Sequence, residues 1–259
     1  MLVCPKCRQP LSKHEKTYAC KAKHSYDIAK KGYVNLVLGN QKISGDSKEM
    51  VEARTLFLSG GYYQVLANQL IDILNELKPH VLVDAGCGEG YYTRQFHASN
   101  RELIAFDLSK PALNTAAKLD KETIYAIASI FDMPIADASV DCVMNIFAPT
   151  PIKEINRILK KGGYLIKVGP AAKHLHGLKT VLYDEVYDNE EESSELSNLH
   201  FVKGISVHDC ITLTSTEQIK ALFVMTPYYW KTSPEAAAKL DKITDLTSEI
   251  DFIINIYQK

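Results

Sequence analysis

The fold is decided by one ten-residue stretch, Val81-Leu82-Val83-Asp84-Ala85-Gly86-Cys87-Gly88-Glu89-Gly90. Its first three residues form a short apolar run, which is typical of a buried parallel strand. Asp84 ends the run, and Gly86 and Gly88 allow the backbone of the next turn to approach a ligand closely. The stretch therefore predicts a strand followed by a ligand-binding turn that opens a helix.

The residues of this turn favour a cationic ligand over a dinucleotide. The dinucleotide pattern G-x-G-x-x-G would need a third glycine where the chain has Tyr91, and Asp84 would repel a pyrophosphate. S-adenosylmethionine carries a sulfonium and an α-amino group, so it tolerates a carboxylate here. Asp107 ends the next apolar run, where a carboxylate can accept both ribose hydroxyls. We therefore predict an S-adenosylmethionine site that includes Asp84, Gly86, Gly88 and Asp107.

Apolar runs and helical patterns alternate outward from this turn. We expect helices over 46–58 and 63–77 before it, and strands over 81–83, 103–106, 124–128, 142–146 and 164–168. Two later strands, over 202–213 and 252–257 around a helix at 217–223, would close the sheet as a hairpin-like edge. This order predicts an α/β fold with a doubly wound, Rossmann-like sheet whose ligand lies at the carboxyl ends of the strands.

Potential metal ligands cluster near the N-terminus in the pattern Cys4-x2-Cys7-x12-Cys20-x3-His24. Three thiolates and one imidazole are the ligand set of a tetrahedral structural zinc site. Four protein ligands leave no open position for catalysis, and the metal would supply much of the folding free energy of so small a module. His14 is an alternative fourth ligand, but the spacing after Cys20 favours His24.

The charge is unevenly distributed along the chain. The whole sequence has 30 basic and 31 acidic residues, but residues 1–54 carry a net charge of +6 and the rest carries −7. Around the predicted zinc site, lysines are interleaved with three tyrosines (Tyr18, Tyr26 and Tyr33). Positive charge for phosphates and rings for base stacking together favour an RNA-binding surface. We interpret the seven acids within 184–195 as a solvated surface loop.

Composition places the protein among soluble globular chains. It has 259 residues, 46% hydrophobic and 24% charged, enough for one large core with an accessory module. No stretch approaches about eighteen consecutive apolar residues, and no charged-then-apolar pattern stands before Cys4, so we expect neither a spanning helix nor a secretory signal. We expect a cytoplasmic protein that does not bind membranes. In that reducing compartment, six cysteines of which three lie within the first twenty positions favour metal binding over a disulfide framework.

Several motifs taken together resemble the bacterial 23S ribosomal RNA (guanine-N1)-methyltransferases, over essentially the whole chain. Besides the cysteine and histidine pattern, they lie at 31–36, 45–50, 61–64, 86–93, 147–149, 169–170, 174–175 and 225–227. Residues 132–146 and 159–163 resemble the later blocks of class I methyltransferases. Ser129 stands where that class often has an acidic residue that contacts the adenine amine.

The resemblance implies a class I methyltransferase sheet with an N-terminal zinc ribbon. It implies that Cys4, Cys7, Cys20 and His24 bind zinc, and that the methyl donor is contacted by Tyr63, Gly88, Glu89 and His174. It further implies methyl transfer from S-adenosylmethionine to N1 of a guanine in a 23S ribosomal RNA hairpin loop. The expected assembly is a homodimer whose paired zinc modules flank an RNA cleft. We accordingly predict a zinc-binding RNA-recognition module at 1–38, a linker and helices at 39–79, and a methyltransferase domain at 80–259.

Two other functions remain open at this point. A small-molecule methyltransferase would use only residues 80–259, and a non-catalytic zinc-ribbon RNA-binding protein would use only residues 1–45. The basic zinc module argues against the first, and the donor residues of the turn argue against the second. No base for the guanine N1 proton is identified, although His174 and Asp84 are conceivable. Asn145 and Phe147 either orient the target base or simply end a strand.

Overall fold

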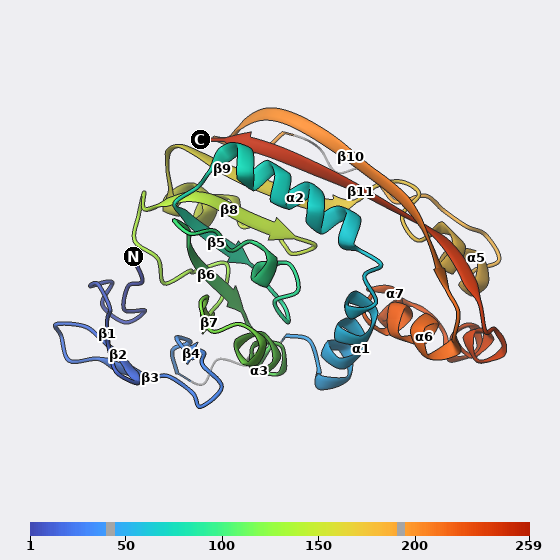
Figure 1. The fold of residues 1–259 in the computed structure, drawn as a ribbon, viewed down its shortest axis with the longest axis horizontal. Coiled ribbons are helices and arrows are strands. Elements are labelled where there is room, and N and C mark those ends of the chain that lie inside the picture. Colours follow the sequence, from blue (N-terminus) through green and yellow to red (C-terminus); the bar gives the residue numbers. More distant parts are fainter. Residues whose placement is uncertain (40–44, 191–194) are drawn as a thin grey trace.

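The computed structural model describes residues 1–39, 45–190 and 195–259, and arranges them in two sheets (Figure 1). The smaller sheet is antiparallel and consists of β1 (Ser12–His14), β2 (Thr17–Ala19) and β3 (Ser25–Asp27). Residues 40–44 of the predicted segment 39–79, and residues 191–194 of the predicted acidic loop, lie outside the described residues.

The larger sheet has the strand order β10-β11-β9-β8-β5-β6-β7-β4. Its strands are β4 (Val34–Asn35), β5 (Val81–Ala85), β6 (Glu102–Asp107), β7 (Ile124–Ile127), β8 (Val140–Ile146), β9 (Leu159–Pro170), β10 (His200–Leu213) and β11 (Leu246–Gln258). The six strands from β9 to β4 are parallel, whereas β11 and β10 are added antiparallel. The predicted doubly wound sheet with a hairpin edge is therefore confirmed.

The strand order reverses at β5, because β6 follows it on one side and β8 on the other. Such a reversal leaves a crevice at the carboxyl ends of the strands, where ligands of open α/β sheets bind. The turn at Gly86 and Gly88 comes directly after β5 and so lies at this position.

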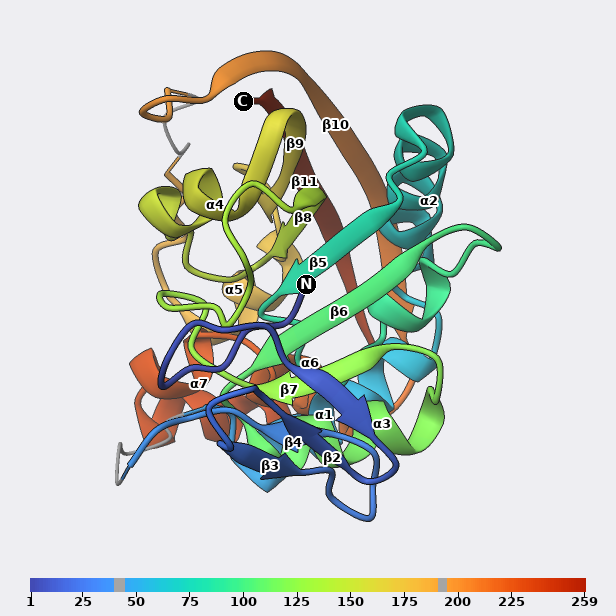
Figure 2. The same ribbon diagram turned by 90° about the vertical axis from the view of Figure 1, so that its left-hand side faces the viewer.

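Helices cover both faces of the larger sheet, with α2 and α4 on opposite sides (Figure 2). The helices of the described residues are α1 (Lys48–Ser59), α2 (Gln64–Leu77), α3 (Lys110–Leu119), α4 (Ile152–Ile158), α5 (His176–Leu182), α6 (Thr216–Val224), α7 (Tyr228–Lys231) and α8 (Pro234–Ala237), with short 3-10 turns η1 (Thr93–Gln95) and η2 (Ala238–Lys242). The expected helices at 46–58, 63–77 and 217–223 correspond to α1, α2 and α6. Ser47 and Ser215 cap α1 and α6 by accepting backbone N–H groups, which explains where these helices begin.

The alternation of side chains along β5 creates two apolar layers. Leu82 packs in the cluster that includes Leu70 and Leu74 of α2, and Val83 packs in the cluster that includes Ile155 of α4. Each is fully buried, and burying such a side chain stabilises the fold by about 1.5–3 kcal/mol. The central strands thus hold the glycine turn on a rigid support.

The antiparallel edge is longer than the sequence pattern indicated. We predicted a strand over 252–257, but β11 begins at Leu246 and pairs with β10 along nearly all its length. Buried and less buried positions already alternate from Leu246 through Ser248 and Ile250. Because Ser248 interrupts the apolar residues of this series, the sequence pattern did not predict the first half of the strand.

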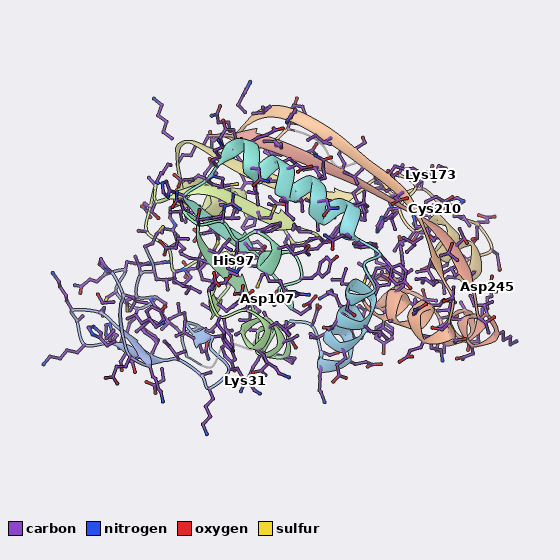
Figure 3. All side chains as sticks on the ribbon, in the orientation of Figure 1. Lys31, His97, Asp107, Lys173, Cys210 and Asp245 are labelled. Carbon is purple, nitrogen blue, oxygen red and sulfur yellow. The ribbon has the colours of Figure 1, made fainter. Side chains whose placement is uncertain are left out.

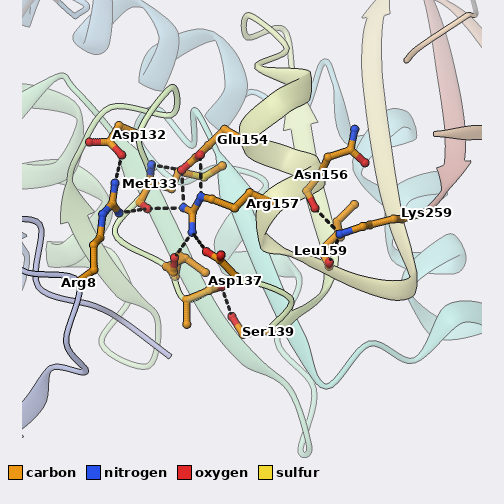
Figure 4. A network of polar contacts seen from close by, with 12 residues as sticks. Arg8, Asp132, Met133, Asp137, Ser139, Glu154, Asn156, Arg157, Leu159 and Lys259 are labelled. Carbon is orange, nitrogen blue, oxygen red and sulfur yellow. Dashed lines mark hydrogen bonds and ion pairs between the residues drawn. The ribbon is translucent and has the colours of Figure 1, made fainter. Parts of the chain in front are cut away.

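The small N-terminal sheet is anchored on the larger one. Val34 of β4 pairs with Ala126 of β7, so the chain of residues 1–38 contributes a strand to the larger sheet. Arg8 also donates to the backbone oxygen of Met133 (3.1 Å), which accepts a second bond from Arg157 (2.9 Å) (Figure 4). Among the described residues, none of the helices is long and apolar enough to span a bilayer.

Candidate functional site

The four predicted metal ligands gather at one point of the N-terminal sheet. Their ligand atoms all lie within 4.8 Å of one another. Cys7 Sγ is 3.6 Å from Cys20 Sγ, and His24 Nδ1 is 3.4 Å from Cys4 Sγ. Ligand atoms of tetrahedral zinc lie roughly 3.5–3.8 Å apart for the usual bond lengths, so this donor set fits zinc. His14 is exposed on β1 and outside the cluster, in agreement with the preference for His24.

The tyrosines of this module do not form the base-stacking surface that the sequence suggested. Tyr18 and Tyr33 are 7% and 5% exposed, because Tyr18 packs in the apolar cluster that the module shares with the larger sheet, and Tyr33 packs in a cluster with residues of α3 and β7. Tyr26 is directed at the metal cluster, with its hydroxyl 3.1 Å from Cys4 Sγ. The five lysines of the predicted surface are exposed (Lys16, Lys21, Lys23, Lys30 and Lys31), and so is Lys13. The module therefore offers charge at its surface rather than aromatic rings.

The glycine turn is tied to the neighbouring strand. The backbone N–H groups of Gly86 and Cys87 both donate to the carbonyl oxygen of Phe106 (2.9 and 3.0 Å). Gly86 has φ of +94°, and a Cβ there would lie only 2.7 Å from the side chain of Ala148. This position therefore requires glycine, and the turn lies close to the end of β8.

Asp107 is the last residue of β6, the strand beside β5 (Figure 3). Its two oxygens accept the backbone N–H groups of Gly88 (2.9 Å) and Ser109 (2.7 Å). Burial raises the pKa of Asp107 above its ordinary value, and these two bonds oppose the rise. Each carboxylate oxygen has a second lone pair, so the group keeps two acceptor sites for a diol.

Asp84 lies buried below the same turn. One of its oxygens accepts the hydroxyl of Thr93 at 2.6 Å, and the other has no partner among the described residues. Burial, together with the nearby charge of Asp107, raises the pKa of Asp84 to about 7, although the Thr93 bond lowers it. A buried acceptor without a partner is costly, and it fits a ligand that brings a donor.

Glu89 and Tyr92 add two further buried groups of this kind. Glu89 accepts from Arg94 at 3.1 Å through one oxygen, while its other oxygen and the Tyr92 hydroxyl are unpaired within the described part of the chain. Burial raises the pKa of Glu89, which Arg94 partly offsets. Such unpaired acceptors match the ammonium and hydroxyl groups of S-adenosylmethionine, so the residues present fit this donor.

Tyr63 and His174 lie together in a second cluster beside the turn. The Tyr63 hydroxyl is 3.3 Å from His174 Nε2, and the backbone N–H of Asp251 donates to His174 Nδ1 (3.2 Å). The proton of the neutral ring is therefore on Nε2. Burial, together with the charge of Lys179, lowers the pKa of His174 to about 3, so the ring is uncharged at neutral pH.

The structure distinguishes Asn145 from Phe147, which the sequence assigned either to orienting the target base or to ending a strand. Asn145 is fully buried and bonded to Ala85, Pro149 and Thr150, which accounts for it structurally. Phe147 instead is 44% exposed and has φ of +51°, a strained conformation for a residue of its size. Its ring lies 6.3 Å from that of His174, nearly parallel. Such strain at an exposed aromatic is typical of functional positions.

The predicted donor residues therefore form two adjoining groups, one at the glycine turn and one around His174. The zinc cluster is separate from both. Four residues beside these groups escaped sequence reasoning: Tyr92 and Thr93 next to the turn, Arg54 near Gly88, and Phe252, whose ring packs against those of Tyr63, Phe147 and His174. Thr93 could have been suspected from its place one helical turn beyond the glycines, but Arg54 and Phe252 reach the site from remote parts of the chain.

Comparison with known proteins supports both halves of the chain. Residues 2–45 match the family model described as RlmA, N-terminal, and residues 83–167 match a methyltransferase domain. The chain is 34% identical over 188 residues to the 23S rRNA (guanine(748)-N(1))-methyltransferase of Streptomyces fradiae, covering 70% of this chain and 67% of that one. It belongs to the family of the 23S rRNA (guanine-N1)-methyltransferases.

A second member of this family covers almost the whole chain. It is a protein of Micromonospora griseorubida, provisionally named a 23S rRNA (guanine-N(1)-)-methyltransferase, with 32% identity over 90% of this chain and 88% of that one. The YcgJ protein of Bacillus subtilis shares the fold at 16% identity, with a TM-score of 0.53 over 74% of this chain and 97% of that one.

Membership of the 23S rRNA (guanine-N1)-methyltransferase family settles the class of activity. The protein is an S-adenosylmethionine-dependent methyltransferase of class I fold with a structural zinc ribbon. Both alternatives are disfavoured, because the relatives of the whole chain combine the two halves that each alternative would use alone.

Proposed function

We propose that this protein transfers a methyl group from S-adenosylmethionine to N1 of a guanine in a hairpin loop of 23S ribosomal RNA. The main support is the 34% identical Streptomyces fradiae relative, whose name gives methylation at N1 of a guanine in 23S rRNA. The exposed lysines of the zinc module and the donor-type turn in the same chain are consistent with an RNA substrate.

The methyl donor would lie across the carboxyl ends of β5 and β6. In this arrangement Asp107 accepts the ribose hydroxyls, and the unpaired oxygens of Asp84 and Glu89 receive its positively charged end. Gly86 and Gly88 leave room for the donor because they have no side chains. Tyr63 and His174 line the other side of the site. When bound, the donor supplies an electrophilic methyl group on a sulfonium.

The target guanine would stack on Phe147. This ring is exposed next to the glycine turn and is fixed from behind by Phe252, at 5.7 Å between centroids. A base must leave its stack to reach such a position, and an aromatic platform stabilises it there by about 1–3 kcal/mol. Replacing Phe147 by Leu should raise KM for RNA about tenfold with unchanged donor affinity. An unchanged KM would remove this residue from base binding.

The protein then acts mainly by positioning its two substrates. In the transfer a bond would form between N1 and the methyl carbon while the carbon–sulfur bond breaks, S-adenosylhomocysteine would leave, and the N1 proton would pass to water. His174 serves orientation rather than proton transfer, because both ring nitrogens are already bonded and the ring is hard to protonate.

We assign RNA recognition to the module of residues 1–38 and donor binding to residues 80–259, joined by the segment 39–79. We further propose a cytoplasmic homodimer, on the basis of the family resemblance. Light scattering of the zinc-loaded protein that gave the mass of one chain would refute the dimer.

The proposed reaction can be tested on ribosomal RNA from cells. A methyl group at N1 blocks base pairing, so reverse transcription stops one nucleotide before a modified guanine. The stop should be present in 23S RNA from the parent strain, absent after deletion of the gene, and restored by the intact gene. A stop that persists in the deletion strain would refute the proposal.

A further inference from the structure

We propose that Arg54 of α1 binds the carboxylate of the methyl donor. The inference rests on the proposed donor site and names a residue of that site that lies far from the glycine turn in sequence. A Cβ built on Gly88 would lie 3.7 Å from Arg54 Nη1, with no other described group within 4 Å. The guanidinium therefore borders the open space above the turn.

The charges around the turn require a cation at this place. Asp84, Glu89 and Asp107 are all acidic and largely buried there. They suit the two positive groups of the donor, but they repel its one negative group, the carboxylate. The positive charge of Arg54 lowers the pKa of Glu89 and of Asp107, which places the guanidinium close to these acids.

Arg94 is the other arginine close to these acids, and its side chain is already engaged. It donates to Glu89 at 3.1 Å, and its guanidinium lies 5.3 Å from the ring centre of Tyr91. Arg54 has a different set of partners, the side chain of Asp46 and the backbone oxygen of Met225 (3.4 Å). A guanidinium has five N–H donors, so these two contacts leave enough for a bidentate bond to a carboxylate.

Contacts through Asp46 hold the side chain of Arg54 in position. Its partner Asp46 precedes α1, and the backbone oxygen of Asp46 accepts the hydroxyl of Ser109 at 2.7 Å. Ser109 caps α3 and donates its backbone N–H to Asp107. A Cβ on Gly45 would come within 2.6 Å of the Ser109 nitrogen, so the chain is pressed against this cap. One connected set of bonds thus fixes Arg54 relative to Asp107.

The test compares two ligands that differ only in the carboxylate. Calorimetry on the zinc-loaded full chain would use S-adenosylhomocysteine and its decarboxylated analogue. Replacing Arg54 by Met should weaken the binding of S-adenosylhomocysteine about 10- to 100-fold. The affinity for the decarboxylated analogue should stay within about threefold of its value in the unaltered protein. Arg54→Lys should recover part of the loss, because it keeps the charge without the bidentate fork. Lys48→Met serves as control, since this lysine is exposed on the same helix.

The outcomes separate a binding role from a structural one. Equal losses for both ligands in Arg54→Met would mean that the residue merely supports α1, and would overturn the inference. Unchanged affinity for S-adenosylhomocysteine would overturn it as well. Failure of the unaltered protein to bind either ligand would instead refute the proposed donor site itself. A thermal melt of each variant identifies loss of folding.

Discussion

The zinc ribbon and the glycine turn are both specified by a few residues at short spacing, but they are stabilised in different ways. The ribbon has strands of only three residues, and its few buried apolar side chains join the cluster of the larger sheet rather than forming a core of their own. The turn is supported by fully buried strands and helices on both sides. A site built on a small module therefore depends on its metal, whereas a site on a large sheet can contain unpaired buried acids and remain folded.

Loss of a zinc ligand should have the largest effect and should be confined to the ribbon. In Cys20→Ser, we expect zinc content below about a tenth of an equivalent and loss of amide protection in β1 to β3, because metal binding supplies the folding free energy there. Protection in β5 to β8 should persist. Metal analysis and hydrogen exchange would measure both.

Cys210→Ser is the matched control, since Cys210 is exposed on β10 and outside the metal cluster. A Cys20→Ser protein with a full equivalent of zinc would contradict the ligand assignment. Loss of protection throughout the larger sheet would show that the two regions are not independent.

A second effect should be confined to the donor site. Asp107→Ala removes a charged acceptor of the ribose hydroxyls, so binding of S-adenosylhomocysteine should weaken by about 2–3 kcal/mol, or roughly 30- to 150-fold. Asp107→Asn should lose less, because its amide oxygen can still accept one bond. Asp241→Ala, an exposed acid on η2, is the control. Calorimetry that finds the Asp107→Ala affinity unchanged would exclude the ribose role.

Donor affinity should also depend on pH, by a smaller factor. Because the pKa of Asp84 is raised to about 7, this group is mostly protonated at pH 5.5 and mostly ionised at pH 7.5. A cationic ligand prefers the ionised form, so affinity should rise about tenfold over this range. Asp84→Asn should remove most of the rise. An equal rise in the variant would assign it to another group.

The raised pKa of Asp84 has the opposite effect on the stability of the ligand-free protein, which should decrease as pH rises. The folded-state pKa of Asp84 lies above the ordinary value of about 4, so folding favours its protonated form. The contribution of Asp84 to stability is therefore greatest at low pH, and it decreases as pH rises from about 4 to about 7.

The two regions also differ in how well the sequence predicted them. The donor turn and the zinc ligands depend on neighbours close along the chain, so their spacing identified Gly86, Gly88 and the four metal ligands. The exposure of the ribbon tyrosines depended on packing, and the expectation for Tyr18 and Tyr33 was wrong because both rings are buried.

The sequence patterns did not predict contacts between segments that lie far apart along the chain. Nothing local marks Arg54 as a neighbour of Gly88, because the contact depends on how α1 packs against α3 and α6. Nor does the pattern of residues 1–38 show that β4 joins the larger sheet beside β7. That strand also changes how the ribbon should be tested. Deleting residues 1–38 would expose an edge of the sheet, so substitutions at the surface are preferable.

The central claim is that the zinc ribbon binds the RNA and the larger sheet binds the methyl donor. It is tested most directly by changing four exposed ribbon lysines (Lys13, Lys16, Lys21 and Lys23) to Gln and measuring methyl transfer to the hairpin RNA. Each lost phosphate contact should reduce the log-log salt slope of RNA binding by about 0.7–0.9. A variant with four exposed lysines changed elsewhere (Lys153, Lys161, Lys239 and Lys242) is the control. We predict a strongly raised KM for RNA with unchanged donor affinity, whereas undiminished methylation by the ribbon variant would contradict the account.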